Sequence, residues 1–249
     1  MRILLTISYD GTDFCGYQVQ PNKRTVEKEL NDAIFLVTGE RVKTVASGRT
    51  DSGVHAVCQK VHFDTNSTIP PKNFKNALNT VLPRDIKVTK SQKVDSEFNA
   101  RYSAKEKTYV YSLYYGDENP LKSRYKTHIK FAPDINKMKS ACELLKGTHD
   151  FKCFLASGSS VKDTVRTIYS IKIVKKGKDI DIKVSGSGFL YNMVRIIVGT
   201  LLGVSEGRIT LDDIKTALEN GDRKKVGKTM PPQGLCLYSV SYTNKVQQK

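Results

Sequence analysis

The chain has 249 residues, enough for one large domain or two medium ones, and its 39% hydrophobic and 27% charged residues are typical of a globular protein. No apolar run approaches the ~20 residues of a membrane span, and Met1 leads directly into strand-like residues, so we expect a cytoplasmic protein that does not enter a membrane. The 41 Lys and Arg against 25 Asp and Glu give a net charge of +16, which favours an anionic partner such as nucleic acid, although a solvated lysine-rich surface would give the same charge.

The first hundred residues predict the order β-α-β-β-α-β. Residues 2–9 alternate apolar and polar side chains, which indicates a strand. Thr25 is expected to cap a helix whose apolar stripe ends at Gly39. Two strands, a second helix and a third strand are expected after it, over residues 41–47, 57–65, 72–82 and 85–94.

The second part of the sequence repeats that order. A tyrosine-rich strand at 108–116 comes first, and Asp134 then caps a helix. A hairpin and two helices follow, the second of them with a Thr210–Asp213 capping box, before a closing strand. The expected ranges are 135–147 for the first helix, 166–188 for the hairpin, 189–207 and 211–221 for the later helices, and 235–242 for the strand.

This repeat indicates an α+β protein with two ferredoxin-like (β-α-β-β-α-β) halves, whose antiparallel sheets flank a central basic cleft. We expect an N-terminal half over residues 1–103 and a C-terminal half over 104–249. The same topology occurs in proteins that bind single-stranded RNA on a sheet, but it also supports many other functions. The five scattered cysteines and four histidines lack the spacing of a disulfide framework or a metal site.

The stretch SGRTDSGVHA, residues 47–56, places one acid beside one base between two glycines. The glycines permit tight backbone, so Asp51 can sit on a loop that reaches a substrate, and nearby positive charge keeps its carboxylate ionised as a nucleophile or base requires. Taken alone, an Arg-Thr-Asp turn is more often a structural ion pair. For His55, a hydrogen-bonded loop residue is favoured over a general base.

Two further stretches combine charge with apolar surroundings. Residues 98–115 (FNARYSAKEKTYVYSLYY) mix cations with tyrosines, which suits phosphates and unstacked bases, and a half-buried strand face explains the tyrosines equally well. Arg195 lies in the apolar helix sequence GFLYNMVRIIVG and needs a partner. A carboxylate such as Asp51, a substrate phosphate or an exit to water would each satisfy it.

Five motifs stand in order along the chain: SYDGTDFCGYQVQ, SGRTDSGVHA, FNARYSAKEKTYVY, GFLYNMVRIIVG and MPPQGLCL. Together they resemble the tRNA pseudouridine synthase A family, over nearly the whole chain from Ser8 to Tyr242. The resemblance implies a homodimeric isomerase that uses neither cofactor nor metal. Its substrate would be tRNA, in which uridine becomes pseudouridine in the anticodon stem-loop, typically at positions 38, 39 and 40.

The resemblance also implies roles for single residues. Asp51 matches the catalytic aspartate, Tyr109 the tyrosine that packs on the target base, and Arg49 the arginine linked with moving that base out of the stack. Arg195 matches the helix arginine placed near the catalytic acid. Possible RNA contacts among the basic residues are Lys23, Arg24, Lys105 and Lys107.

Two regions depart from the family pattern. Met230 stands where the family usually has alanine, and residues 152–160 contain none of the arginine that many members carry there. These departures leave the target position less defined than the reaction. The alternatives are a non-catalytic RNA-binding or chaperone protein on the same platform and a paralogue that modifies other RNA uridines.

Overall fold

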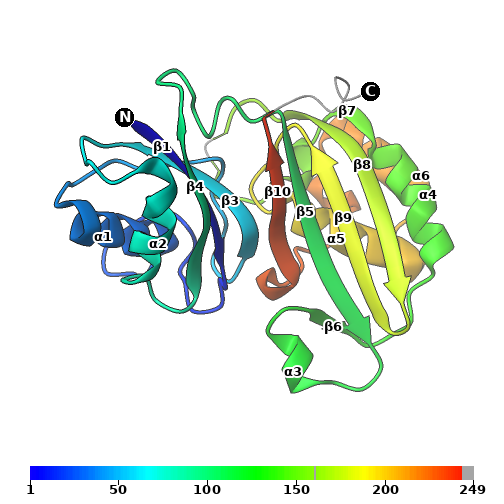
Figure 1. Cartoon of the computed structure of the whole chain (residues 1–249). Coiled ribbons are helices and arrows are strands. Elements are labelled where there is room, and N and C mark those ends of the chain that lie inside the picture. The colour runs from blue at the N-terminus through cyan, green and yellow to red at the C-terminus, as the bar shows by residue number, and fades with distance from the viewer. Residues whose placement is uncertain (160, 243–249) are drawn as a thin grey trace, which may run out of the picture. The chain divides into compact units, whose positions relative to one another are not determined.

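The computed structural model describes residues 1–159 and 161–242 and divides the chain into two compact units (Figure 1). Unit 1 comprises Met1–Lys105 together with the segment that begins at Cys236, and unit 2 comprises Glu106–Leu235. Both units combine helices with mostly antiparallel strands, which confirms the expected α+β class. Within the described ranges, no helix is long and apolar enough to cross a membrane.

Unit 1 is a sheet with two helices. The strands run in the order β4-β1-β3, with antiparallel pairing, and β2 pairs antiparallel with β3 at Val61–His62. The closing strand β10 joins the same β3 in parallel, with Cys236 opposite His55. The elements are β1 (Arg2–Tyr9), α1 (Val26–Thr38), β2 (Val45–Ala46), β3 (His55–Asp64), α2 (Phe74–Asn79), β4 (Ile86–Val94) and β10 (Leu235–Ser241).

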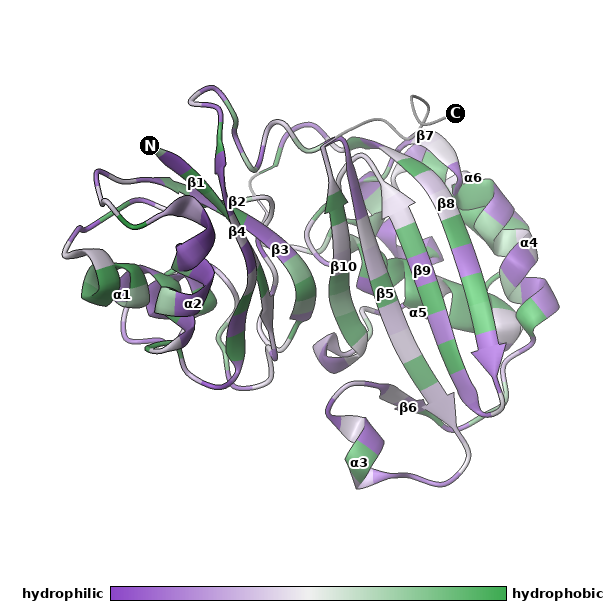
Figure 2. Ribbon diagram, viewed as in Figure 1, coloured by the Kyte–Doolittle hydropathy of each residue, from purple (hydrophilic) through white to green (hydrophobic). Residues whose placement is uncertain are grey.

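The core of unit 1 follows from the periodicities of its sequence. The alternating residues Ile3, Leu5 and Ile7 of β1 are fully buried, as are Leu30 and Ile34 on the apolar stripe of α1. Figure 2 shows the corresponding hydrophobic bands on the strands and helices. Each such side chain contributes roughly 1.5–3 kcal/mol when it leaves water, so these stripes fix which face of α1 meets the sheet.

Two expected elements of unit 1 are shorter than predicted. The strand expected at 41–47 is confined to Val45–Ala46, and the guanidinium of Arg41 instead lies 4.6 Å from the centre of the Phe35 ring. The helix expected at 72–82 ends at Asn79. The Asn79 side chain bonds both the N–H (2.8 Å) and the carbonyl (2.9 Å) of Val88, which connects the end of the helix to β4.

Unit 2 has its own antiparallel sheet in the order β5-β9-β8-β7, and β6 runs parallel to β5. Helices α4, α5 and α6 lie on one face of it (Figure 1). The elements are β5 (Glu106–Tyr115), α3 (Pro120–Ser123), β6 (Thr127–Ile129), α4 (Ile135–Leu145), β7 (Gly147–Asp150), β8 (Val165–Lys176), β9 (Asp179–Gly186), α5 (Met193–Ser205) and α6 (Leu211–Asn220).

Unit 2 differs from the expectation in three places. The short elements α3, β6 and β7 have too few residues to show a periodicity in the sequence. Helix α5 begins at Met193 instead of residue 189, because Asn192 adopts a left-handed conformation (φ 60°) that breaks the helix there. The closing strand, which we expected in the C-terminal half, pairs with β3 of unit 1.

Candidate active site

Asp51 lies on the loop between β2 and β3 and is half-buried. Its carbonyl accepts a hydrogen bond from the N–H of Val54 (3.1 Å), which closes a turn over Ser52 and Gly53. Gly53 has φ +75°, a conformation that glycine adopts without the steric cost of a Cβ. The turn therefore requires the second glycine of the SGRTDSG stretch, as expected.

A second segment, residues 10–17, contacts the Asp51 loop along one side. The N–H of Tyr17 donates to the carbonyl of Thr50 (3.0 Å), and the hydroxyl of Ser52 donates to the carbonyl of Phe14 (3.1 Å). At Gly11, a Cβ would lie only 2.1 Å from the carbonyl oxygen of Val54. The contact explains why the DGTDFCGY stretch accompanies SGRTDSG in one sequence.

Buried polar groups fix the start of the loop. The hydroxyl of Ser47 donates to Oε1 of Gln59 (2.6 Å), and Nε2 of Gln59 donates to the carbonyl of Gly48 (2.7 Å). Both Ser47 and Gln59 are fully buried. Since the loop is bonded at both ends and along one side, the Asp51 backbone has little freedom, which is the condition for a preorganised catalytic group.

Arg49 is not the ion-pair partner of Asp51 that the sequence suggested. Its side chain is exposed and makes no ion pair with the residues that the structure describes. The structural ion pair between Arg49 and Asp51, the simplest explanation of the Arg-Thr-Asp turn, is therefore not formed.

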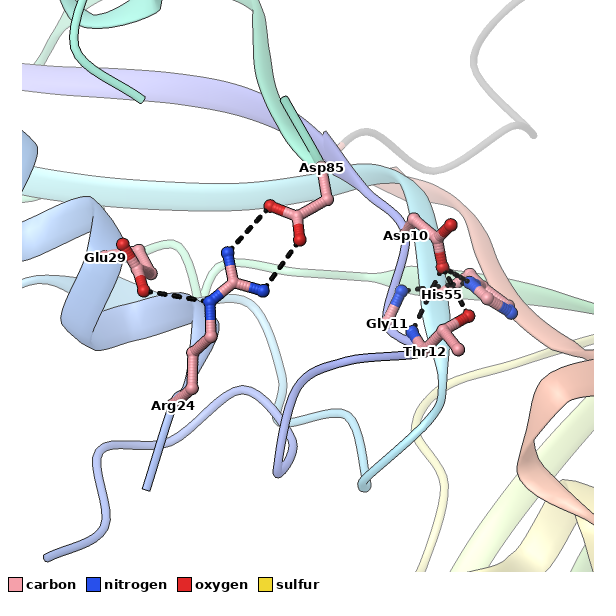
Figure 3. Close-up of polar contacts among 7 residues, drawn as sticks. All are labelled: Asp10, Gly11, Thr12, Arg24, Glu29, His55 and Asp85. Atoms are coloured by element: carbon pink, nitrogen blue, oxygen red, sulfur yellow. Dashed lines mark hydrogen bonds and ion pairs between the residues drawn. The ribbon is translucent and has the colours of Figure 1, made fainter. Parts of the chain in front are cut away.

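His55 is buried at the start of β3, beside the segment that fixes the loop (Figure 3). Its Nδ1 lies 3.0 Å from the N–H of Gly11 and 3.2 Å from Oδ1 of Asp10. That Asp10 oxygen also accepts hydrogen bonds from the N–H (3.0 Å) and hydroxyl (2.6 Å) of Thr12. Nδ1 either accepts from Gly11 or donates to Asp10, and either bond holds the ring in place. The expected hydrogen bonding is confirmed, but His55 begins strand β3 instead of lying on a loop.

Arg24, one of the four possible RNA contacts, is engaged within unit 1 (Figure 3). Two of its nitrogens donate to the carboxylate of Asp85 (2.7 and 3.0 Å), and Nε donates to Glu29 (3.1 Å). The hydrogen bonds that Arg24 donates to Asp85, more than any other influence, raise the pKa of Arg24. Its guanidinium also lies 4.1 Å from the centre of the Phe14 ring, so it supports the segment that holds the Asp51 loop.

The other three candidate RNA contacts are more accessible. Lys23 and Lys105 are exposed, and Lys107 is half-buried at the start of β5. Lys105 is bonded through its backbone N–H to the carbonyl of Ser241 (2.9 Å), which fixes its main chain.

In unit 2, Tyr109 lies on β5 and is buried, with 8% of its surface exposed. Its ring meets that of Phe189 edge to face, with 5.3 Å between the ring centres. Such pairs contribute about 0.5–1.5 kcal/mol beyond area burial, so Phe189 fixes the plane of the Tyr109 ring.

Arg195 stands in the first turn of α5 and is half-buried. Its Nε donates to the carbonyl of Met230 (2.6 Å), and its Nη1 donates to Oδ1 of Asn192 (2.5 Å). The N–H of Met230 donates in return to the Arg195 carbonyl (3.3 Å). Two of the three guanidinium nitrogens therefore have fixed acceptors in unit 2, which supplies partners that the sequence did not identify.

The MPPQG motif holds Arg195 through its backbone. The hydroxyl of Tyr111 donates to the carbonyl of Pro231 (2.7 Å) and lies 2.7 Å from the hydroxyl of Thr127. At Gly234, a Cβ would lie 2.7 Å from the Tyr111 ring, so the glycine permits this close approach. Since Arg195 uses the carbonyl of Met230, the replacement of the usual alanine by methionine leaves the acceptor in place.

Two buried thiols in unit 2 are poor candidates for the nucleophile. Burial raises the pKa of Cys142 and of Cys153 to about 12. At neutral pH these cysteines stay protonated and unreactive.

The comparison with known proteins agrees with the motifs. The sequence profile described as tRNA pseudouridine synthase matches residues 5–103 and 141–243, well over half of the chain. The chain belongs to the tRNA pseudouridine synthase family. The matched segments contain Arg49, Asp51 and Arg195, whereas Tyr109 lies between them.

Relatives within the tRNA pseudouridine synthase family match almost the full length. "tRNA pseudouridine synthase A 2" of Clostridium perfringens is 49% identical over 97% of this chain and 99% of its own length. "tRNA pseudouridine synthase A" of Anoxybacillus flavithermus is 46% identical over 98% and 99%. The protein of the same name from Bacillus subtilis is 46% identical over 98% and 100%.

The region that departs from the family pattern lies beside α5. Residues Lys152–Phe154 form a short 3-10 helix with Phe154 fully buried, and the N–H of Ala156 donates to the carbonyl of Tyr191 (3.2 Å). Ser160, the last residue of that region, lies outside the described residues. The segment thus contacts the chain just before the helix that carries Arg195.

Sequence reasoning missed the residues that support the site. Gln59 and Phe14 bond Gly48 and Ser52 of the Asp51 loop, and Asn192 accepts a hydrogen bond from Arg195. Phe14 and Asn192 stand inside two of the five motifs, and that was a usable signal. Gln59 follows the SGRTDSGVHA stretch by three residues and gave none, since a buried glutamine in a strand shows no pattern.

Proposed function

We propose that this protein isomerises uridine to pseudouridine in tRNA, with Asp51 as the catalytic carboxylate. The observation that carries the proposal is the Asp51 loop: a half-buried acid on a backbone that is hydrogen-bonded at several points, inside a segment that the family profile matches. A binding protein has no use for a fixed carboxylate in front of a polyanion, because the two negative charges repel each other.

The reaction breaks the bond between N1 of uracil and C1′ of the ribose. The base then rotates, C5 bonds to C1′, and C5 gives up its proton, so the product has the same composition as the substrate. The Asp51 carboxylate starts this sequence either by attack on the substrate or by removal of a sugar proton. No metal or cofactor enters either route.

The remaining side chains bind and move the substrate in this proposal. Extrusion of a stacked uridine costs a few kcal/mol, and Arg49, exposed and unengaged within the described residues, is suited to occupy the vacated space. Tyr109, held by Phe189, packs on the flipped base. Arg195 offers a positive charge to the RNA, and the exposed Lys23 and Lys105 contact phosphates together with Lys107.

We further propose the finer features of the family for this chain. Unit 1 supports a ferredoxin-like half, because its strand order β4-β1-β3-β2 is that of an antiparallel β-α-β-β-α-β unit. The proposed target is the anticodon stem-loop at positions 38, 39 and 40, the proposed assembly is a homodimer, and the proposed location is the cytoplasm. Mass photometry of the purified protein tests the dimer, which a monomeric mass would contradict.

The decisive experiment uses tRNA labelled with tritium at uridine C5. Isomerisation releases the label to water, and we expect release by the wild-type protein and none by Asp51→Asn or Asp51→Ala. Both variants should still bind tRNA with near-wild-type affinity in a filter assay, because the change removes a negative charge from an RNA-binding surface. Asp32→Asn is the matched control, since that exposed residue only forms an i,i+4 pair with Lys28 on α1.

Each outcome separates the alternatives. Binding without tritium release by the wild-type protein would establish the non-catalytic RNA-binding protein instead. Substantial release by Asp51→Asn would remove Asp51 from the reaction. Mapping pseudouridine in the same tRNA distinguishes positions 38–40 from the targets of a paralogue.

A further inference from the structure

Asn192 has an unusual backbone for its place in the fold. It immediately precedes α5 with φ 60° and ψ 6°, the left-handed conformation that residues other than glycine seldom adopt. Among the described residues, Asn22 is the other non-glycine residue with positive φ, and it lies in an exposed turn. Asparagine tolerates this conformation better than most residues other than glycine, and it keeps the conformation where the surrounding structure stabilises it.

The side chain of Asn192 forgoes its ordinary role. Asparagine is among the best N-cap residues, because its oxygen accepts from the backbone N–H groups of the first helical turn. At the N-cap of α5 the Asn192 side chain makes no such bond. Its Oδ1 instead accepts from Nη1 of Arg195, three residues further on.

The Met230 carbonyl and the Asn192 side chain act together on Arg195. The guanidinium is planar, so one bond from Nε to the Met230 carbonyl and another from Nη1 to Asn192 fix both its place and its plane. The Met230 carbonyl is supplied by backbone that Tyr111 also holds, through the adjacent Pro231 carbonyl. Asn192 is therefore a side chain that helps to fix the orientation of the Arg195 guanidinium.

We propose that Asn192 is a positioning residue for the isomerisation, which it serves by orienting the Arg195 guanidinium toward the RNA. To make this bond, Asn192 adopts a left-handed backbone and leaves the N-cap of α5 without a side-chain hydrogen bond. The inference rests on the proposed function, and its effect falls on the chemical step, because a displacement of about 1 Å in a positioned group can cost ~100-fold in rate.

The test compares three substitutions of Asn192 in the full-length protein. Glycine fits the left-handed backbone best but provides no acceptor, aspartate retains an acceptor oxygen and tolerates φ > 0, and alanine lacks both advantages. We expect Asn192→Gly to lower the single-turnover rate of pseudouridine formation at saturating tRNA by about 10- to 100-fold. Asn192→Asp should stay within about fivefold of wild type, and Asn192→Ala should be as slow as Asn192→Gly.

Thermal unfolding of the same variants separates positioning from a structural role. The Tm of Asn192→Gly should equal or exceed that of Asn192→Asp and Asn192→Ala, because glycine fits the left-handed backbone best. The rate should show the opposite order for glycine and aspartate, because only aspartate retains an acceptor oxygen. A purely structural role would give one order in both measurements.

Three results would overturn the inference. Wild-type rate in Asn192→Gly would show that the carboxamide is dispensable, and equal rates in Asn192→Gly and Asn192→Asp would show that the acceptor oxygen has no part. An Asn192→Gly protein that fails to fold would contradict the fit of glycine to this backbone. If the wild-type protein forms no pseudouridine, the proposed function is contradicted, and the inference about Asn192 loses its basis.

Discussion

At the scale of single residues, the site depends on glycines that permit backbone contact. Gly11 and Gly16 face the Asp51 loop, where a Cβ would lie 2.1 Å from the carbonyl oxygen of Val54 and 3.0 Å from that of Thr50. Gly16 also has φ +90°. The position of Asp51 thus depends on the absence of a Cβ at Gly11 and Gly16.

Gly11→Ala should displace this loop. The carbonyl of Val54 cannot stay where it is, and overpacking of this kind costs about 1–3 kcal/mol. We expect a lower Tm and a tritium-release rate at least about tenfold below wild type, since a small displacement of Asp51 affects the chemical step. Gly188→Ala is the control for stability, because its Cβ would meet nothing nearer than 3.8 Å. An unchanged rate in Gly11→Ala would show that the loop does not depend on this contact.

At the scale of elements, the sequence predicted the helix ends that are capped by neighbouring residues. Thr210 and Asp213 form the expected capping box of α6, in which the Thr210 hydroxyl accepts from the Asp213 N–H (3.0 Å). The hydrogen bond from Lys225, followed by those from Thr210, lowers the pKa of Asp213. Asp134 likewise caps α4, and Gly39 ends α1 in the left-handed conformation. Thr25, in contrast, makes no side-chain capping bond, although it occupies the N-cap of α1.

Thr210→Ala should destabilise unit 2 by about 1 kcal/mol, the typical cost of a lost N-cap. The matched control is Thr216→Ala within the same helix. Alanine has the higher helix propensity there, so stability should stay equal or rise slightly. Chemical denaturation of both variants measures the difference, and equal midpoints for the two would contradict the capping role of Thr210.

At the scale of the whole molecule, the net charge of +16 favours binding to the negatively charged RNA. Each phosphate contact releases counterions, so affinity depends on salt concentration as well as on shape. Arg24 is already paired with Asp85 and Glu29, so we expect the exposed lysines to make the phosphate contacts.

The affinity for tRNA should fall steeply with salt. For about four phosphate contacts we expect a loss of about 100-fold between 50 and 200 mM salt, measured by filter binding. Lys23→Ala should reduce the slope of log affinity against log salt by about one contact without a change in Tm. Arg24→Ala should lower the Tm, because it leaves Asp85 without the bidentate partner. A slope near zero would exclude phosphate contacts as the source of affinity.

The sequence by itself determined the α+β class, most strands and helices, the reaction expected from five motifs, and Asp51 as the residue to test. These features are readable because periodicity, caps and motif glycines act over a few neighbouring residues. The tertiary structure alone decided that β10 pairs with β3, that Arg24 is engaged by Asp85, and that Asn192 and Met230 hold Arg195. Contacts between residues tens of positions apart leave no local pattern, because they arise only when burial brings the two segments together.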